Sequence, residues 1–101
     1  MKIEKFTFNP FAENTYVIYD ERTKDCIIID PGCYESNEEK ILLNFILSNK
    51  LVPSKLINTH CHIDHIFGNN FVMKNWNVEL FFHKKEEELL NQSKNIAKSY
   101  G

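Results

Sequence analysis

The sequence has few cysteines, a single arginine and no long apolar run. No apolar run approaches the length of a membrane-spanning helix, and the first residues lack the pattern of a signal peptide, so we expect a cytoplasmic protein with no membrane partner. Three cysteines are too few, and odd in number, for a disulfide-linked secreted domain; we expect reduced thiols, with Cys26 buried. One arginine and a net charge of −2 argue against a nucleic-acid partner, which would need a basic face.

The 101 residues, 43% hydrophobic and 26% charged, suffice for one small domain. Apolar periodicity and turn residues predict alternating strands and helices, hence an α/β (α+β) domain with one mixed sheet. The apolar run at 26–29 predicts a strand buried on both faces, Ser36 or Asn37 a helix cap, and Pro53 a break in the chain. The predicted strands are 1–8, 15–19, 26–29, 55–58 and 78–82, and the predicted helices are 36–50, 67–76 and 84–99.

These elements leave one face of the sheet without a second layer. We expect the helices on one face, and residues such as Tyr16, Ile18 and Ile28 on the other. A bare apolar face is an association surface. The last predicted element is a helix with no closing strand after it, so the sequence suggests half of a larger fold.

The segment at 60–65 carries the chemistry. Within six residues it holds His60, His62, Asp64 and His65, whose imidazole and carboxylate groups are ligands for Zn²⁺ and other divalent metals. In an extended loop His60 and His62 point to one side and can bind one ion, and Asp64 and His65 can bind a second. Two ions about 3.5–4 Å apart can share a hydroxide and polarise a substrate oxygen. The alternative is a solvated loop with chance histidines, but packing explains such a cluster poorly.

The segment Thr59-His60-Cys61-His62-Ile63-Asp64-His65 resembles the H-x-H-x-D-H signature of the metallo-β-lactamase-fold hydrolases. Three further stretches are similar to the glyoxalase II-like (hydroxyacylglutathione hydrolase-like) branch, in the same order: 14–16 (NTY), 27–32 (IIIDPG) and 67–69 (FGN). The resemblance implies the amino-terminal half of an αββα sandwich, so that residues 1–101 are part of a single domain whose carboxy-terminal half is absent.

The resemblance also implies roles. His60 and His62 would bind the first metal ion, and Asp64 and His65 the second, with two zinc ions in a complete site and iron or manganese as other options. A metal-bound hydroxide would attack the thioester or ester carbonyl of a small-molecule substrate. Asp64 would also handle a proton as a catalytic residue, and Asp30 would support the metal loop from behind.

The sequence departs from the family pattern by lacking the downstream ligands, so we expect the 101 residues to be inactive by themselves. His83, the remaining histidine, is interpreted as a surface or capping residue. Cys61 lies between two proposed ligands and would point away from them in an extended loop, with thiol reactivity or soft-metal binding as the alternative. Glu86–Glu88 is interpreted as a solvated helix face. The aromatic residues Trp76, Phe81 and Phe82 are expected in the core.

Two other functions remain open. The same amino-terminal signature occurs in mononuclear iron enzymes of this fold that oxidise persulfides, as persulfide dioxygenases do. Alternatively, the chain is a non-catalytic metal-binding fragment that self-associates through its open sheet face or is completed by a carboxy-terminal half.

Overall fold

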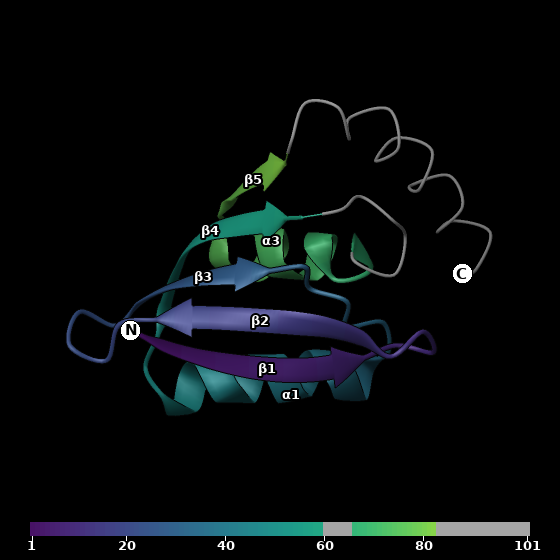
Figure 1. The fold of residues 1–101 in the computed structure, drawn as a ribbon, viewed down its shortest axis with the longest axis horizontal. Helices are drawn as coiled ribbons and strands as arrows, with labels where there is room; N and C mark the ends of the chain where they lie inside the picture. Colours follow the sequence, from purple (N-terminus) through teal and green to yellow (C-terminus); the bar gives the residue numbers. More distant parts are fainter. Residues whose placement is uncertain (60–65, 83–101) are drawn as a thin grey trace.

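The computed structural model describes residues 1–59 and 66–82, which form one twisted sheet with helices behind it (Figure 1). In chain order the elements are β1 (Lys2–Phe8), β2 (Glu13–Tyr19), β3 (Asp25–Ile29), α1 (Ser36–Ser48), β4 (Val52–Asn58), α3 (Asn69–Trp76) and β5 (Glu79–Phe82). No helix in the described ranges is long and apolar enough to cross a membrane.

The strands lie in sequence order across the sheet. The pairs β1–β2 and β2–β3 are antiparallel, whereas β3–β4 and β4–β5 are parallel and are connected through α1 and α3. Two successive right-handed crossovers in one direction place both helices on the same face of a sheet, and Figure 1 shows α1 and α3 there. The predicted mixed sheet with helices on one face is confirmed.

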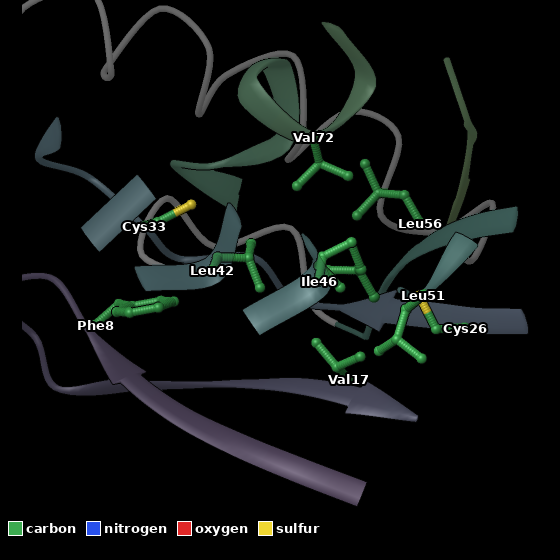
Figure 2. Packing of buried hydrophobic residues seen from close by; sticks show 10 residues of the cluster. Phe8, Val17, Cys26, Cys33, Leu42, Ile46, Leu51, Leu56 and Val72 are labelled. Carbon is green, nitrogen blue, oxygen red and sulfur yellow. The ribbon is translucent and has the colours of Figure 1, made fainter. Parts of the chain in front are cut away.

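The core lies between the sheet and its two helices (Figure 2). Leu42 and Ile46 of α1 and Val72 of α3 are fully buried against the strands. From the sheet, the buried side chains that meet them include Val17, Cys26, Ile28 and Leu56. The spacing of Leu42 and Ile46, four residues apart, gives α1 a single apolar stripe, which explains why it lies flat on the sheet.

The prediction for the uncovered face was wrong at Ile28, which is fully buried beneath the helices. Side chains alternate along a strand, so its half-buried neighbours Ile27 and Ile29 point to the opposite face, and the run at 26–29 is not buried on both faces. The strand register aligns two rows there: Ile3, Ile18, Ile27, Lys55 and Glu79 in one, and Lys5, Tyr16, Ile29, Ile57 and Phe81 in the other. We name these two rows the open sheet face.

Three local predictions also need correction. The N-cap of α1 is Glu35 rather than Ser36 or Asn37. Pro53 lies inside β4, beside a register shift against β3, where the missing N–H of proline is tolerated. Phe81 is 42% exposed rather than in the core, whereas Trp76 and Phe82 are partly buried against core residues.

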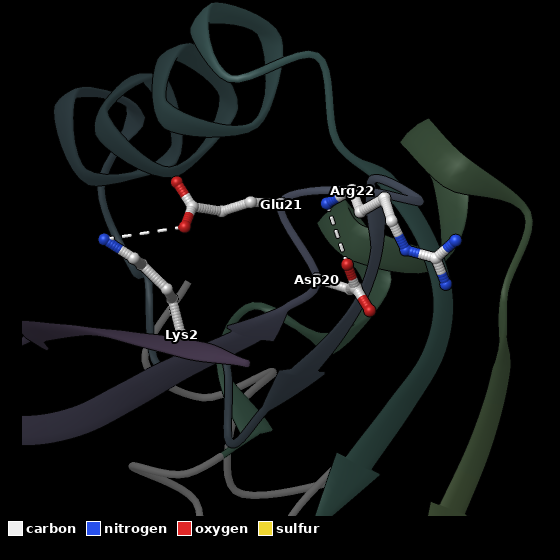
Figure 3. Close-up of polar contacts among 4 residues, drawn as sticks. All are labelled: Lys2, Asp20, Glu21 and Arg22. Carbon is white, nitrogen blue, oxygen red and sulfur yellow. Dashed lines mark hydrogen bonds and ion pairs between the residues drawn. The ribbon is translucent and has the colours of Figure 1, made fainter.

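The hairpin between β2 and β3 is closed by polar contacts (Figure 3). The Asp20 carboxylate accepts hydrogen bonds from the backbone N–H groups of Arg22 and Thr23, at 2.8 and 3.2 Å. These two bonds hold the pKa of Asp20 below its usual value. The exposed pair Lys2–Glu21, at 3.6 Å, joins the hairpin to β1 but contributes little, because solvent screens it.

Candidate metal site

The carboxyl ends of the parallel strands meet at one edge of the sheet. Asp30 follows β3 directly, and Thr59 follows β4 directly. Ligand sites in open α/β sheets lie outside the carboxyl ends of parallel strands. The histidine cluster begins at the next residue, His60, so the chain enters it from this edge.

Asp30 holds the residue that precedes the cluster. Its Oδ1 accepts a hydrogen bond from the Thr59 backbone N–H at 2.8 Å, and its Oδ2 accepts one from the Thr59 hydroxyl at 2.5 Å. The Asp30 N–H in turn donates to the carbonyl of Ile57 at 2.9 Å. Asp30 is 4% exposed and has a φ of 52°, a left-handed conformation that aspartate tolerates better than most residues. Both oxygens of one carboxylate thus hold Thr59, the last described residue before His60.

A buried threonine supports the backbone around Asp30. Thr15 accepts a hydrogen bond from the Gly32 N–H at 2.9 Å. Its hydroxyl proton lies within reach of the Asp30 carbonyl at 2.8 Å and of a Glu13 carboxylate oxygen at 3.1 Å. The sequence reasoning overlooked Glu13, although strand alternation places it on the same face as Thr15.

The residues that follow the cluster are also held near the ends of β3 and β4. The Gly68 N–H donates to the Pro31 carbonyl at 2.7 Å. The buried amides of Asn58 and Asn69 exchange two hydrogen bonds, at 3.1 and 2.8 Å, between the end of β4 and the start of α3. The residues on both sides of the cluster are therefore held by contacts that do not involve its histidines.

Gly68 permits this close approach. A Cβ at this position would clash with Cys33 Sγ and would lie 2.7 Å from the Pro31 oxygen. Its φ of −94° is accessible to any residue, so the glycine is required for space rather than for backbone conformation.

The proposed ligands His60, His62, Asp64 and His65 lie outside the described residues, as do Cys61, His83 and Glu86–Glu88. Within 1–59 and 66–82, no group of three or more His, Cys, Asp or Glu side chains is placed to hold a metal ion. The donor chemistry of the cluster, three imidazoles and one carboxylate, fits zinc and also iron or manganese. Asp30 bonds to Thr59, the residue before the first of these donors, whereas the metal loop that it is expected to support lies outside the described residues.

The two described cysteines belong to the hydrophobic core. Cys26 and Cys33 are free and buried, as expected for Cys26. Burial raises the pKa of each thiol to about 12, with smaller contributions from Asp25 at Cys26 and from Glu39 at Cys33. Burial thus disfavours the thiolate, the reactive form, at both positions.

Three relatives show which proteins the chain is similar to. It is 28% identical over 90 residues to the "Probable metallo-hydrolase YqgX" of Bacillus subtilis, covering 89% of this chain and 40% of that protein. It is 32% identical over 79 residues to "Glyoxylase B2" of Dictyostelium discoideum, covering 70% of this chain and 27% of that protein. It is 29% identical over 69 residues to the "Hydroxyacylglutathione hydrolase" of Prochlorococcus marinus, covering 67% of this chain and 26% of that protein. The chain thus spans two fifths or less of the length of these relatives.

Solved structures agree in fold. The BLEG-1 B3 metallo-β-lactamase matches with a TM-score of 0.78 and 27% identity, over 88% of this chain and 40% of that one. TTHA1623, in a di-iron-bound form, matches with a TM-score of 0.75 and 22% identity, over 97% of this chain and 46% of that one. The family model for the metallo-β-lactamase superfamily matches residues 8–96. With this match, and with Asp30 and Thr59 placed at the carboxyl ends of parallel strands, the chain belongs to the metallo-β-lactamase superfamily.

Proposed function

We propose that this chain is the metal-binding, amino-terminal part of a hydrolase that cleaves a thioester or ester bond of a small-molecule substrate. The observation that carries the proposal is the Asp30–Thr59 contact, which fixes the chain where the H-x-H-x-D-H segment begins. The names of the relatives support the reaction class, since two are a glyoxylase and a hydroxyacylglutathione hydrolase. Because those proteins are much longer, we expect hydrolysis to need parts of the domain outside these residues.

The roles follow the donor chemistry. His60 and His62 bind one ion, Asp64 and His65 bind a second, and zinc is the metal that this set fits best. The ions, when bound, polarise a carbonyl oxygen and make water a stronger nucleophile at neutral pH. Asp64 holds and moves a proton during turnover, whereas Asp30 and Thr59 orient the loop without touching substrate.

We further propose a cytoplasmic location. The free thiols of Cys26 and Cys33 are compatible with a reducing compartment, where disulfides are rare.

Metal analysis of purified variants tests the proposal. We expect the chain, dialysed against zinc and then against buffer, to retain zinc, and a His60→Ala/His62→Ala variant to lose it. His83→Ala is the matched control, because it removes a histidine outside the signature and should keep the metal. Equal zinc in the wild type and the double variant would contradict the assignment, as would a wild type that retains none.

The metal that the protein retains on purification from cells distinguishes the hydrolase from the iron-dependent dioxygenase alternative. Protein purified without added metal should contain mainly zinc. One iron per chain would instead favour the iron-dependent dioxygenase alternative, which uses the same signature.

A further inference from the structure

The turn at 30–32, which follows β3, is hydrogen-bonded at each of its backbone polar groups. Proline has no N–H, and every other N–H and C=O of the turn has a partner at 2.7–2.9 Å. One partner, Asn9, is itself held, because its N–H donates to the Glu38 carboxylate at 2.7 Å. The partners are the Ile57 carbonyl, the Gly68 N–H, the side-chain amide of Asn9 and the hydroxyl of Thr15.

Thr15 differs from the other partners because its one hydroxyl serves two peptide groups. The oxygen accepts a hydrogen bond from the Gly32 N–H at 2.9 Å and lies 2.8 Å from the Asp30 carbonyl oxygen, to which the hydroxyl can donate. These groups lie on either side of Pro31, so the hydroxyl spans the turn. The Thr15 side chain is fully buried, and its branched Cβ restricts rotation about χ1. The direction of the hydroxyl is therefore well defined.

Asp30 needs support because of its backbone conformation. Its φ of 52° is in the left-handed region, which costs free energy in a residue with a Cβ and persists where the surroundings hold it. From this conformation both carboxylate oxygens reach Thr59. A change of Asp30 to a negative φ would redirect its side chain away from Thr59. The bond between the Thr15 hydroxyl and the Asp30 carbonyl opposes that change.

Stability of the sheet alone does not account for a hydroxyl at this position. Thr15 lies on the buried face of β2, between Glu13, which is 4% exposed, and Val17, which is fully buried. A Glu13 carboxylate oxygen lies 3.1 Å from the same hydroxyl, so two polar side chains are buried together. Replacing both partners of such a bond by apolar groups of the same shape is often neutral for stability. The polar pair therefore suggests a role in directing the turn.

We propose that Thr15 is a positioning residue for metal binding, because its hydroxyl holds Asp30 in the left-handed conformation from which the carboxylate bonds to Thr59. In this role Thr15 acts through Asp30 and is not itself a ligand. The effect on metal binding rests on the proposed function, whereas the effect on the Asp30–Thr59 contact concerns described residues alone. The two effects are measured separately.

The test compares two substitutions of Thr15 in the chain of 101 residues. Thr15→Val keeps the branched shape and removes the hydroxyl, whereas Thr15→Ser keeps the hydroxyl and removes the methyl group. In the metal-free chain, NMR hydrogen exchange at the Thr59 amide should be about fivefold faster or more in Thr15→Val, the factor that corresponds to one lost hydrogen bond. Zinc affinity measured by calorimetry should fall about tenfold or more in Thr15→Val, and less than about threefold in Thr15→Ser.

Two controls separate positioning from a general loss of stability. Thr7→Val removes the hydroxyl of an exposed threonine in β1, which bonds to Asn14 at 3.2 Å, and should leave both measurements at their wild-type values. Ile46→Val creates a small cavity in the core, so it should lower the stability of the whole domain without changing zinc affinity. Urea denaturation of every variant shows whether zinc affinity follows the hydroxyl or the stability.

Loss of zinc affinity in Thr15→Val with retention in Thr15→Ser would support the role of Thr15. Equal losses in both variants, losses that follow stability across all variants, or an unchanged Thr59 amide in Thr15→Val would overturn it. If Thr15→Val does not fold, Thr15→Ala replaces it in the comparison, because it also lacks the hydroxyl. If the wild type binds no zinc but its Thr59 amide responds to Thr15→Val, the hold of Thr15 on Asp30 stands and the proposed metal-binding function is what fails.

Discussion

Replacing Gly68 by alanine tests whether close packing at the end of the metal loop holds the site together. The added Cβ would meet Cys33 Sγ on one side and the Pro31 carbonyl oxygen, at 2.7 Å, on the other. The thiol is buried and the oxygen is backbone, so neither can move aside without disturbing its neighbours. The backbone conformation itself adds no cost, because φ at Gly68 is −94°.

The expected cost follows from two contributions. Overpacking a buried site costs about 1–3 kcal/mol. Displacing the Gly68 N–H from the Pro31 carbonyl loses a hydrogen bond worth about 1 kcal/mol. We therefore expect Gly68→Ala to lower the free energy of unfolding by about 2–4 kcal/mol, a large share of the stability of a small domain.

Urea denaturation followed by circular dichroism measures this cost. Asn70→Ala, an exposed position two residues on, is the matched control and should change the free energy of unfolding by less than about 0.5 kcal/mol. Cys33→Ala removes one of the two clashing atoms, so in that background the glycine substitution should cost less but not zero, because the Pro31 oxygen remains. A Gly68→Ala variant as stable as Asn70→Ala would refute the reasoning.

Three further changes probe the site, the thiols and the open sheet face. Asp30→Asn would place an amide NH₂ group, itself a donor, against the Thr59 N–H or the Thr59 hydroxyl, so one of these hydrogen bonds would be lost. Zinc affinity measured by calorimetry should then fall about 10–100-fold, and unchanged affinity would contradict the orienting role of Asp30. With Cys61→Ser, labelling of Cys26 and Cys33 in the folded chain should stay slow at pH 7 and at pH 9, because both thiols are buried and pKa values of about 12 leave little thiolate at either pH, and it should accelerate in urea; fast labelling of the folded chain would argue against burial. Ile27→Thr should reduce self-association through the open sheet face in sedimentation velocity experiments, and identical sedimentation of variant and wild type would count against that interface.

The fold was largely predictable because its elements are local patterns. Three features can each be recognised within a few consecutive residues: the alternation of apolar and polar side chains in strands, the four-residue apolar spacing in α1, and the turn at 30–32. The face of each residue in the run at 26–29 was not predictable, because four consecutive apolar side chains show no periodicity. There the register with β2 and β4 decides which side chains meet the helices.

The surroundings of the candidate site were less predictable than its ligands. The histidine cluster is contiguous in sequence, so its chemistry is evident without a fold. The link from Glu38 to Asn9 joins residues 29 apart, and the contact between Gly68 and Cys33 joins residues still farther apart. Such contacts depend on the paths of loops, which residue type and spacing do not specify.

The long sequence separation of the Asp30–Thr59 contact has a consequence for the order of folding. The hairpins β1–β2 and β2–β3 join neighbouring segments, but the carboxylate and the threonine it binds are 29 residues apart. That bond requires α1 to cross the sheet and β4 to pair in parallel with β3, which is an entropically costly closure. We therefore expect the Asp30–Thr59 contact to form late, after the antiparallel strands β1, β2 and β3 have paired. Kinetic analysis would then give Asp30→Asn mainly a faster unfolding rate and little change in the folding rate.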